Sequence, residues 1–187
     1  MKIASIKTAQ KLINSGFFTL DTETTGIKKD AEIVEIAVLD QHGGLVFHSL
    51  IKPSKPIPKE VISIHGITNE MVENAPCFED VALELLDLLS LQNIVAHNAY
   101  FDRKRLEYEF AKCGLTLNAT WECTMFLTTA KGQKWNKLAE ALEQLQIEVE
   151  GVAHRALHDA ECCRQIVLAL AQQSIFKCFF NLRQNYE

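Results

Sequence analysis

The stretch that decides the fold is FFTLDTETTG, residues 17–26. Aromatic and β-branched residues are frequent from Phe17 to Glu23, which predicts a strand, and Thr24-Thr25-Gly26 predicts its end. Alternate side chains of a strand share a face, so Asp21 and Glu23 project together from the end of an apolar strand. A pair of carboxylates is also common at a solvated strand end. Further acids are therefore needed before this pair indicates a functional site.

The segments around this strand predict an α/β fold. Two further strands are expected at residues 32–39 and 45–51, joined by a turn at 40–44, and a short buried strand at 94–96. Helices are expected at residues 8–15, 78–89, 98–113, 123–130, 135–145 and 155–172, with a last short helix at 174–181. Strands that come first and then alternate with helices indicate an α/β sandwich around a mixed sheet.

The composition narrows the class of protein. The chain of 187 residues suits one domain, and its net charge of −5 excludes a protein that coats duplex nucleic acid with a basic surface. No apolar run reaches membrane-spanning length, and the first residues lack the apolar core of a signal peptide. We therefore expect a cytoplasmic protein with no membrane partner. The six cysteines form no C-x-x-C pair, so reduced thiols are expected rather than a zinc site.

Two further acids each lead an apolar helix face. The residues on the face of Asp102 are Leu106, Phe110 and Cys113. Those on the face of Asp159 are Cys162, Cys163, Ile166, Val167 and Leu170. An acid in a first helical turn also favours the helix dipole, by ~0.3–1 kcal/mol, but this does not explain an inward face. A buried carboxylate must be protonated, paired or bound to metal, and no Lys or Arg lies on either stripe.

Acids from one strand and two helices would repel one another if they converged without cations. Carboxylate ligands favour Mg²⁺ or Mn²⁺ over zinc, and two such ions ~3.5–4 Å apart can clamp both reacting oxygens of a phosphodiester. His154 lies five residues before Asp159 and could take a proton from water, although an ordinary loop histidine is the simpler interpretation in isolation. His158 is another candidate for this role. Because it is adjacent to Asp159 in the sequence, it lies ~100° around the helix from that acid and is expected to point elsewhere.

Three segments resemble the exonuclease motifs of the DEDDh family: DTETTG at 21–26, HNAYFD at 97–102 and HRALHDA at 154–160. That family includes the proofreading subunit of the bacterial replicative polymerase, exonuclease X and ribonuclease T. The resemblance covers about residues 16–172. It implies one exonuclease domain over 1–187 with an RNase H-like fold, in which helices flank a five-stranded mixed sheet.

The resemblance also implies an activity. Terminal phosphodiesters would be hydrolysed from a free 3′ end, with release of 5′-mononucleotides and with two Mg²⁺ or Mn²⁺ ions as cofactors. The metal ligands would be Asp21, Glu23, Asp102 and Asp159, and His154 would activate water. One departure is Cys123-Thr124, where family members often carry Asp-Thr, but that Asp is not one of the four ligands.

A fourth segment, EVISIHGIT at residues 60–68, is similar to the family segment that helps hold the terminal nucleotide. It makes His65 the better candidate for substrate contact and Glu60 the weaker one. The remaining substrate-binding candidates are Thr24, Ile27, Asn98 and Phe101.

Structural interpretations exist for the same side chains. Ile27 and Phe101 could be core residues, Asn98 a helix cap, and His65 a turn residue before Gly66.

The identity of the nucleic acid stays open at this point. Single-stranded DNA is favoured over RNA as the partner, because the low basic charge argues against a broad duplex-binding surface. An exoribonuclease acting on short or structured RNA ends is the first alternative. A non-catalytic end-binding subunit of a DNA polymerase is the second, and a homodimer could form through Phe176, Phe179 and Phe180. Lys131, Lys134 and Lys137 could touch the incoming strand, although a solvated face is the simpler interpretation.

Overall fold

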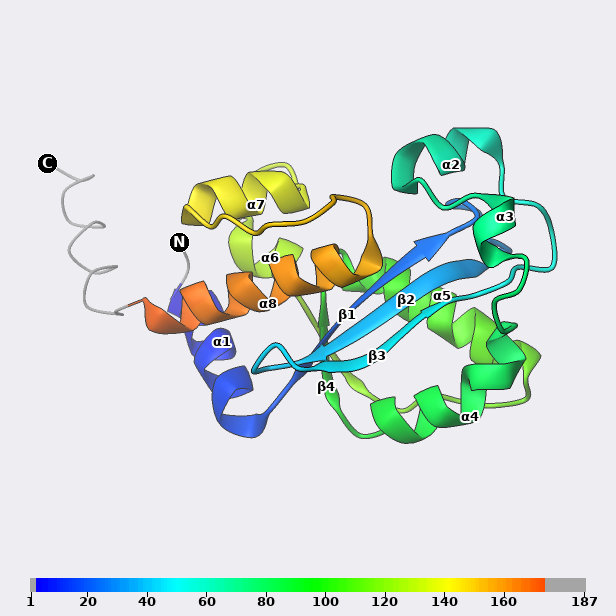
Figure 1. The fold of residues 1–187 in the computed structure, drawn as a ribbon. Coiled ribbons are helices and arrows are strands. Elements are labelled where there is room, and N and C mark those ends of the chain that lie inside the picture. Colours follow the sequence, from blue (N-terminus) through cyan, green and yellow to red (C-terminus); the bar gives the residue numbers. More distant parts are fainter. Residues whose placement is uncertain (1–2, 174–187) are drawn as a thin grey trace, which may run out of the picture.

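A computed structural model describes residues 3–173. Its five strands form one mixed sheet in the order β3-β2-β1-β4-β5 (Figure 1). The strands are β1 (Phe18–Thr24), β2 (Ile33–Asp40), β3 (Leu45–Leu50), β4 (Asn93–Ala96) and β5 (Thr120–Cys123). β1 is central, since it pairs antiparallel with β2 and parallel with β4. The predicted five-stranded mixed sheet is therefore confirmed.

Helices cover both faces of the sheet. They are α1 (Ile3–Ser15), α2 (Lys59–His65), α3 (Asn69–Val72), α4 (Phe78–Leu89), α5 (Ala99–Lys112), α6 (Thr124–Thr128), α7 (Leu138–Leu145) and α8 (Ala156–Gln172). One core cluster joins the sheet to α4 and α5, and a second joins it to α1, α7 and α8. Figure 1 shows α4 below the sheet and α8 running across its other side. Within residues 3–173, no helix is both long and apolar enough to span a bilayer.

Burial on both faces explains the sequence of β2. It reads IVEIAVLD, and every residue except Asp40 is buried. A strand covered on both sides is expected to be an almost continuous apolar run, and Glu35 is the one charged interruption within it. A fully buried charge in such a strand must have partners. These partners belong to the candidate site.

The element boundaries differ from the predictions in several places. α1 begins at Ile3 rather than residue 8, because Ile6, Ala9 and Leu12 form one buried face. α7 begins at Leu138 rather than 135, and α6 ends at Thr128. α2 and α3 were not predicted as helices. The helix predicted at 174–181 and the phenylalanines of the expected dimer contact lie outside the described residues.

Candidate active site

The four predicted acids converge at the carboxyl end of β1. Asp21 and Glu23 come from that strand, Asp102 from the first turn of α5 and Asp159 from the first turn of α8. The backbone N–H and the hydroxyl of Thr22 both donate to Asp102 Oδ1, at 3.1 and 2.8 Å. These bonds tie α5 to β1 across 80 residues of chain, and they leave Oδ2 of Asp102 unused by Thr22. The geometry that the sequence predicted, with acids from three elements in one place, is present.

The acids perturb one another. Burial raises the pKa of Asp21 well above its usual range, and the charges of Asp102, Asp159 and Glu23 raise it further. Burial and the neighbouring carboxylates raise the pKa of Glu23 to about 8. Burial raises the pKa of Asp102 to about 7 despite the bonds from Thr22, and burial also raises that of Asp159. Such a cluster is stable in its ionised form only beside positive charge.

The chemistry of these donors fits hard divalent cations. Four carboxylates supply oxygen ligands, as Mg²⁺ and Mn²⁺ prefer. Cys162 lies close to Asp159 and His158, but burial raises the pKa of its thiol to about 12. The four acids offer only oxygen ligands, unlike the nitrogen and sulfur donors that structural zinc sites use, so this set does not favour zinc.

His154 lies beside these acids on an exposed loop. One ligand atom each from His154, Glu23 and Asp159 lies within 4.8 Å of the others. His154 has a φ of 60°, in the left-handed region that non-glycine residues seldom adopt. A Cβ on Gly151 would collide with the ring of His158, so this loop packs directly on the first turn of α8. The loop thus holds an uncommon backbone conformation at a residue that reaches the acids.

Sequence reasoning missed Glu35, which anchors the residue after His154. Arg155 donates from Nε and Nη2 to the two carboxylate oxygens of Glu35, at 2.9 and 2.7 Å. His48 Nε2 lies 2.9 Å from Oε1, and the backbone N–H of Ala156 donates to Oε2 at 3.0 Å. Glu35 is 0% exposed. Burial pushes its pKa up, but the bonds from Arg155, His48 and Ala156 outweigh this and leave the pKa lowered, so Glu35 stays ionised.

The signal for Glu35 was present in the sequence as the single acid in the apolar run of β2. Its partner Arg155 lies 120 residues away, so no local pattern could identify the pair. A β-bulge between Glu23 and Thr24 lies at the same point, where β1 pairs Glu23 with Glu35 and then Thr24 with Ile33. Bulges redirect side chains at the ends of strands, and this one is next to the acids.

Five of the six predicted substrate-contact residues line one cavity of about 610 Å³ at the end of β1: Thr24, Ile27, Glu60, His65 and Phe101. Glu23 lines it as well, so the cavity opens beside the acids. Ile27 is 88% exposed, so its interpretation as a core residue was wrong. Phe101 is partly buried, and its ring lies under the guanidinium of Arg105.

His65 offers a hydrogen-bond donor to this cavity. Its Nδ1 accepts the backbone N–H of Ile67 at 3.0 Å, so Nε2 carries the proton of the neutral ring. Burial lowers the pKa of His65, which agrees with a neutral ring. Nε2 is buried, and its approach to the backbone of Thr24, which raises the pKa, falls short of good hydrogen-bond geometry. The ring therefore has a weakly used donor in the wall of the cavity, between α2 and the end of β1.

Asn98 does not behave as the predicted cap. It precedes α5 with φ 50° and ψ 47°, and its side chain makes no capping hydrogen bond. The left-handed conformation is one that Asn tolerates better than most residues, which explains the residue type. Asn98 is not among the residues that line the cavity.

A family model described as exonuclease matches residues 18–167, from β1 into α8. The chain belongs to the exonuclease family. Its relatives are DEDDh-type 3′→5′ exonucleases, so the predicted resemblance is confirmed. The enzyme class, a 3′→5′ exonuclease, follows from the same relatives, and the family is of a kind that uses divalent metal ions.

The exonuclease family match is supported by individual relatives. An uncharacterized exonuclease, CP81 of Escherichia phage 186, is 41% identical over 180 residues, covering 88% of this chain and 92% of that protein. The DNA polymerase III epsilon subunit of Pasteurella multocida is 33% identical, covering 84% and 69%. A solved structure of exonuclease X in complex with 5′ overhanging duplex DNA is 31% identical with a TM-score of 0.64, covering 82% and 89%.

Proposed function

We propose that this exonuclease hydrolyses the terminal phosphodiester at the 3′ end of single-stranded DNA in a metal-dependent reaction and releases 5′-mononucleotides. The observation that carries the proposal is the convergence of four acids with raised pKa values, Asp102 buried and the others partly buried, beside a cavity lined by five of the predicted substrate-contact residues. Together they suit an anionic substrate held by cations at one end and by hydrogen bonds at the other.

Asp21, Glu23, Asp102 and Asp159 would hold two divalent ions, Mg²⁺ or Mn²⁺. When bound, these ions would neutralise the carboxylates and the phosphate and activate the attacking and leaving oxygens. Thr22 keeps Asp102 in position through its two bonds to Oδ1. The β-bulge after Glu23 and the hydrogen-bonded start of α8 orient the other acids.

His154 is proposed as the general base. Its ring lies within reach of Glu23 and Asp159, where an attacking water would need to lose a proton. Its exposure lets the proton pass on to solvent. The bidentate pair between Arg155 and Glu35 restricts the backbone next to His154 and thereby the range of positions that the imidazole can adopt.

The terminal nucleotide is proposed to occupy the cavity beside Glu23. Ile27 and Phe101 supply apolar surface for a base or sugar, and His65 Nε2 supplies a donor. DNA is favoured over RNA as substrate, because one relative is a subunit of DNA polymerase III and another, exonuclease X, is solved in complex with DNA. Association with a DNA polymerase stays a prediction that the epsilon relative supports.

The test is digestion of 3′-labelled oligonucleotides of matched sequence, as DNA and RNA, each single-stranded and double-stranded. Reactions contain Mg²⁺, Mn²⁺ or a chelator. We expect mononucleotide release from single-stranded DNA with either ion and none with the chelator. Preferential digestion of RNA would show that the enzyme is an exoribonuclease and would contradict the proposed DNA substrate. Cleavage that persists in chelator, or binding without cleavage under every condition, would overturn it.

A further inference from the structure

A second surface at the same end of the sheet carries exposed aromatic and basic side chains. Phe126 on α6 and Trp135 in the following loop are 50% and 54% exposed, and their ring centroids lie 4.7 Å apart at an interplanar angle of 44°. A pair of half-exposed aromatic rings offers a flat apolar surface on which a planar ligand group can stack. We call these rings, with Lys131, Lys134 and Lys137, the α6–α7 platform.

The charge of the platform is opposite to that of the whole chain. The net charge is −5, yet three lysines fall within residues 131–137 and no acid occurs from Thr124 to Lys137. All three lysines are exposed, and none joins a salt bridge within the part of the chain that the structure describes. The next acid, Glu140, accepts the backbone N–H of Lys137 at 2.7 Å as a helix cap. The lysine charges are thus available to an anion.

Hydrogen bonds hold the platform against the catalytic core. Asn136 lies between Trp135 and Lys137, and its backbone N–H donates to Thr129 Oγ1 at 2.9 Å. Its carbonyl accepts from His97 Nε2 at 3.0 Å, while His97 Nδ1 lies 2.9 Å from Thr124 Oγ1. His97 begins the segment that leads to Asp102. The loop that carries Trp135 is therefore tied to the segment that carries one of the acids.

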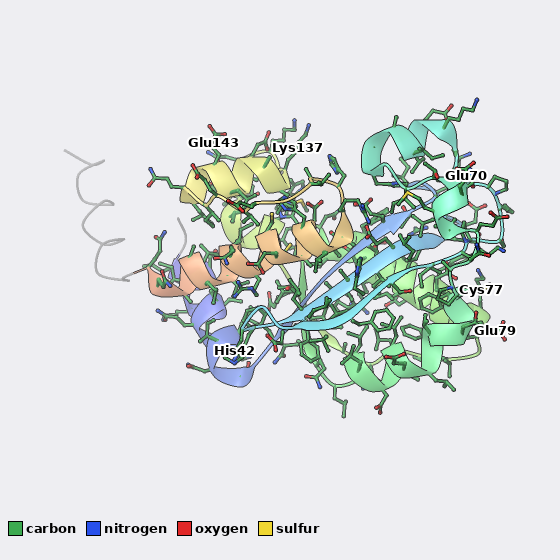
Figure 2. All side chains as sticks on the ribbon, in the orientation of Figure 1. His42, Glu70, Cys77, Glu79, Lys137 and Glu143 are labelled. Carbon is green, nitrogen blue, oxygen red and sulfur yellow. The ribbon has the colours of Figure 1, made fainter. Side chains whose placement is uncertain are left out.

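The topology puts the platform next to the acids. β1, β4 and β5 are parallel neighbours, so their carboxyl ends, at Thr24, Ala96 and Cys123, share one edge of the sheet. In Figure 1 the tip of β1 lies close below α2, and the α6–α7 pair lies to its left. Figure 2 shows Lys137 at the end of α7 nearer that tip, with Glu143 at the far end. The cavity proposed for the terminal nucleotide is lined by residues of α2, whereas the platform follows β5, on the other side of β1 in the strand order.

We propose that the α6–α7 platform binds the single-stranded nucleic acid upstream of the scissile phosphate. Bases stack on the pair of Phe126 and Trp135, and the lysines contact the backbone phosphates. Stacking on aromatic rings tolerates any base, which suits an enzyme that advances along a strand one nucleotide at a time. The direction of the strand rests on the function proposed above, whereas the binding itself does not.

The experiment uses the full chain and two substrates, a deoxythymidine dinucleotide and a deoxythymidine decanucleotide. We expect W135A to raise KM for the decanucleotide at least about 5-fold, since each stacked base contributes substantially to binding. Its kcat, and both constants for the dinucleotide, should stay near those of the wild type. W135F should restore most of the loss, because it keeps a ring. The logarithm of the binding constant for the decanucleotide falls linearly with the logarithm of the salt concentration. K131Q/K134Q should make this slope less steep by about 0.7 per lost phosphate contact.

The matched control is K7Q/K11Q, which removes two exposed lysines of α1. It should leave kcat and KM unchanged for both substrates. Decanucleotide binding is also measured by fluorescence anisotropy in chelator, where cleavage is not required. If W135A leaves decanucleotide affinity unchanged, the proposal is overturned. The proposal is also overturned if W135A impairs cleavage of the dinucleotide as much as cleavage of the decanucleotide. Trp135 would then support the active site only structurally. If the wild type cleaves neither substrate but W135A still weakens anisotropy binding, the proposed function fails and the platform stands.

Discussion

At the residue scale, Glu35 joins two parts of the active site. It is buried in the central region of the sheet opposite Glu23, and it binds both the side chain that follows His154 and the first N–H of α8. Its charge adds to the repulsion on Glu23, yet its partners keep it ionised. A buried charge whose bonds go to Arg155, His48 and the first N–H of α8 is best explained by the geometry that it imposes.

We therefore expect E35Q to lower kcat by about 10- to 100-fold while KM changes little, as for other residues that orient metal-site groups. The amide replaces one acceptor by a donor that faces Arg155, so the bidentate contact is lost. Steady-state kinetics on a single-stranded DNA substrate measure both constants. E84Q, an exposed change on α4, serves as the control. A kcat for E35Q equal to that of the wild type would show that the pair does not position His154.

The residue scale also shows what the sequence could predict. The four acids were predictable, because Asp102 and Asp159 each lead an apolar helix face where a lone charge is costly, and Asp21 and Glu23 share one face at the end of a strand. His154 needed the family motif, since geometry alone could not separate it from a loop histidine. Glu35 was not predictable as a site residue, because its partner is 120 positions away and only the sheet register brings them together.

At the element scale, α5 supports both the acids and the cavity. Asp102 in its first turn bonds to β1, and Arg105 donates from Nη1 to the carbonyls of Lys28 and Ala31 in the loop that lines the cavity. Arg105 is 6% exposed. The helix was predicted almost to its ends because its apolar face is periodic. The short α2 was missed, since a helix of 7 residues shows too little periodicity for a pattern to reveal.

We expect R105Q to lower the free energy of unfolding by about 1–3 kcal/mol, because the buried carbonyl of Ala31 and the partly buried carbonyl of Lys28 lose their donor. It should also raise KM, since the cavity wall loosens. Urea denaturation with a common slope gives the first quantity. R103Q is the comparison. Arg103 pairs with Glu107 on the helix surface, so this substitution should cost less than about 1 kcal/mol. Equal effects of the two substitutions would contradict this account of α5.

At the scale of the whole molecule, the acid cluster links stability to pH and to cations. The pKa of Glu23 rises from 4.5 to about 8 on folding and that of Asp102 from 3.8 to about 7, so the folded state binds more protons than the unfolded state between these values. The contribution of these two groups to the free energy of unfolding is therefore greatest below pH about 4. This contribution is lost as the pH rises through about 7 to 8.

The metal-free protein should therefore melt at a lower temperature at pH 8.5 than at pH 5.5, by a few degrees, given ~2–4 °C per kcal/mol for a protein of this size. Adding Mg²⁺ should raise Tm more at pH 8.5 than at pH 5.5, because the ionised carboxylates bind the cation. Differential scanning calorimetry with chelator or Mg²⁺ measures both differences. A Tm in chelator that is flat or rising up to pH 8.5 would argue against a converged cluster.

The central claim is that His154 and the converged acids carry out hydrolysis at a 3′ end. Its most direct test is the rate of mononucleotide release from 3′-labelled single-stranded DNA in Mg²⁺ by the wild type, H154A and H42A. His42 is exposed in the turn between β2 and β3, at the opposite end of the sheet from the tip of β1 in Figure 2. H154A should reduce the rate by about 10²- to 10⁴-fold, the usual contribution of a general base, and H42A should leave it unchanged. A rate for H154A within a few-fold of the wild type would contradict the account.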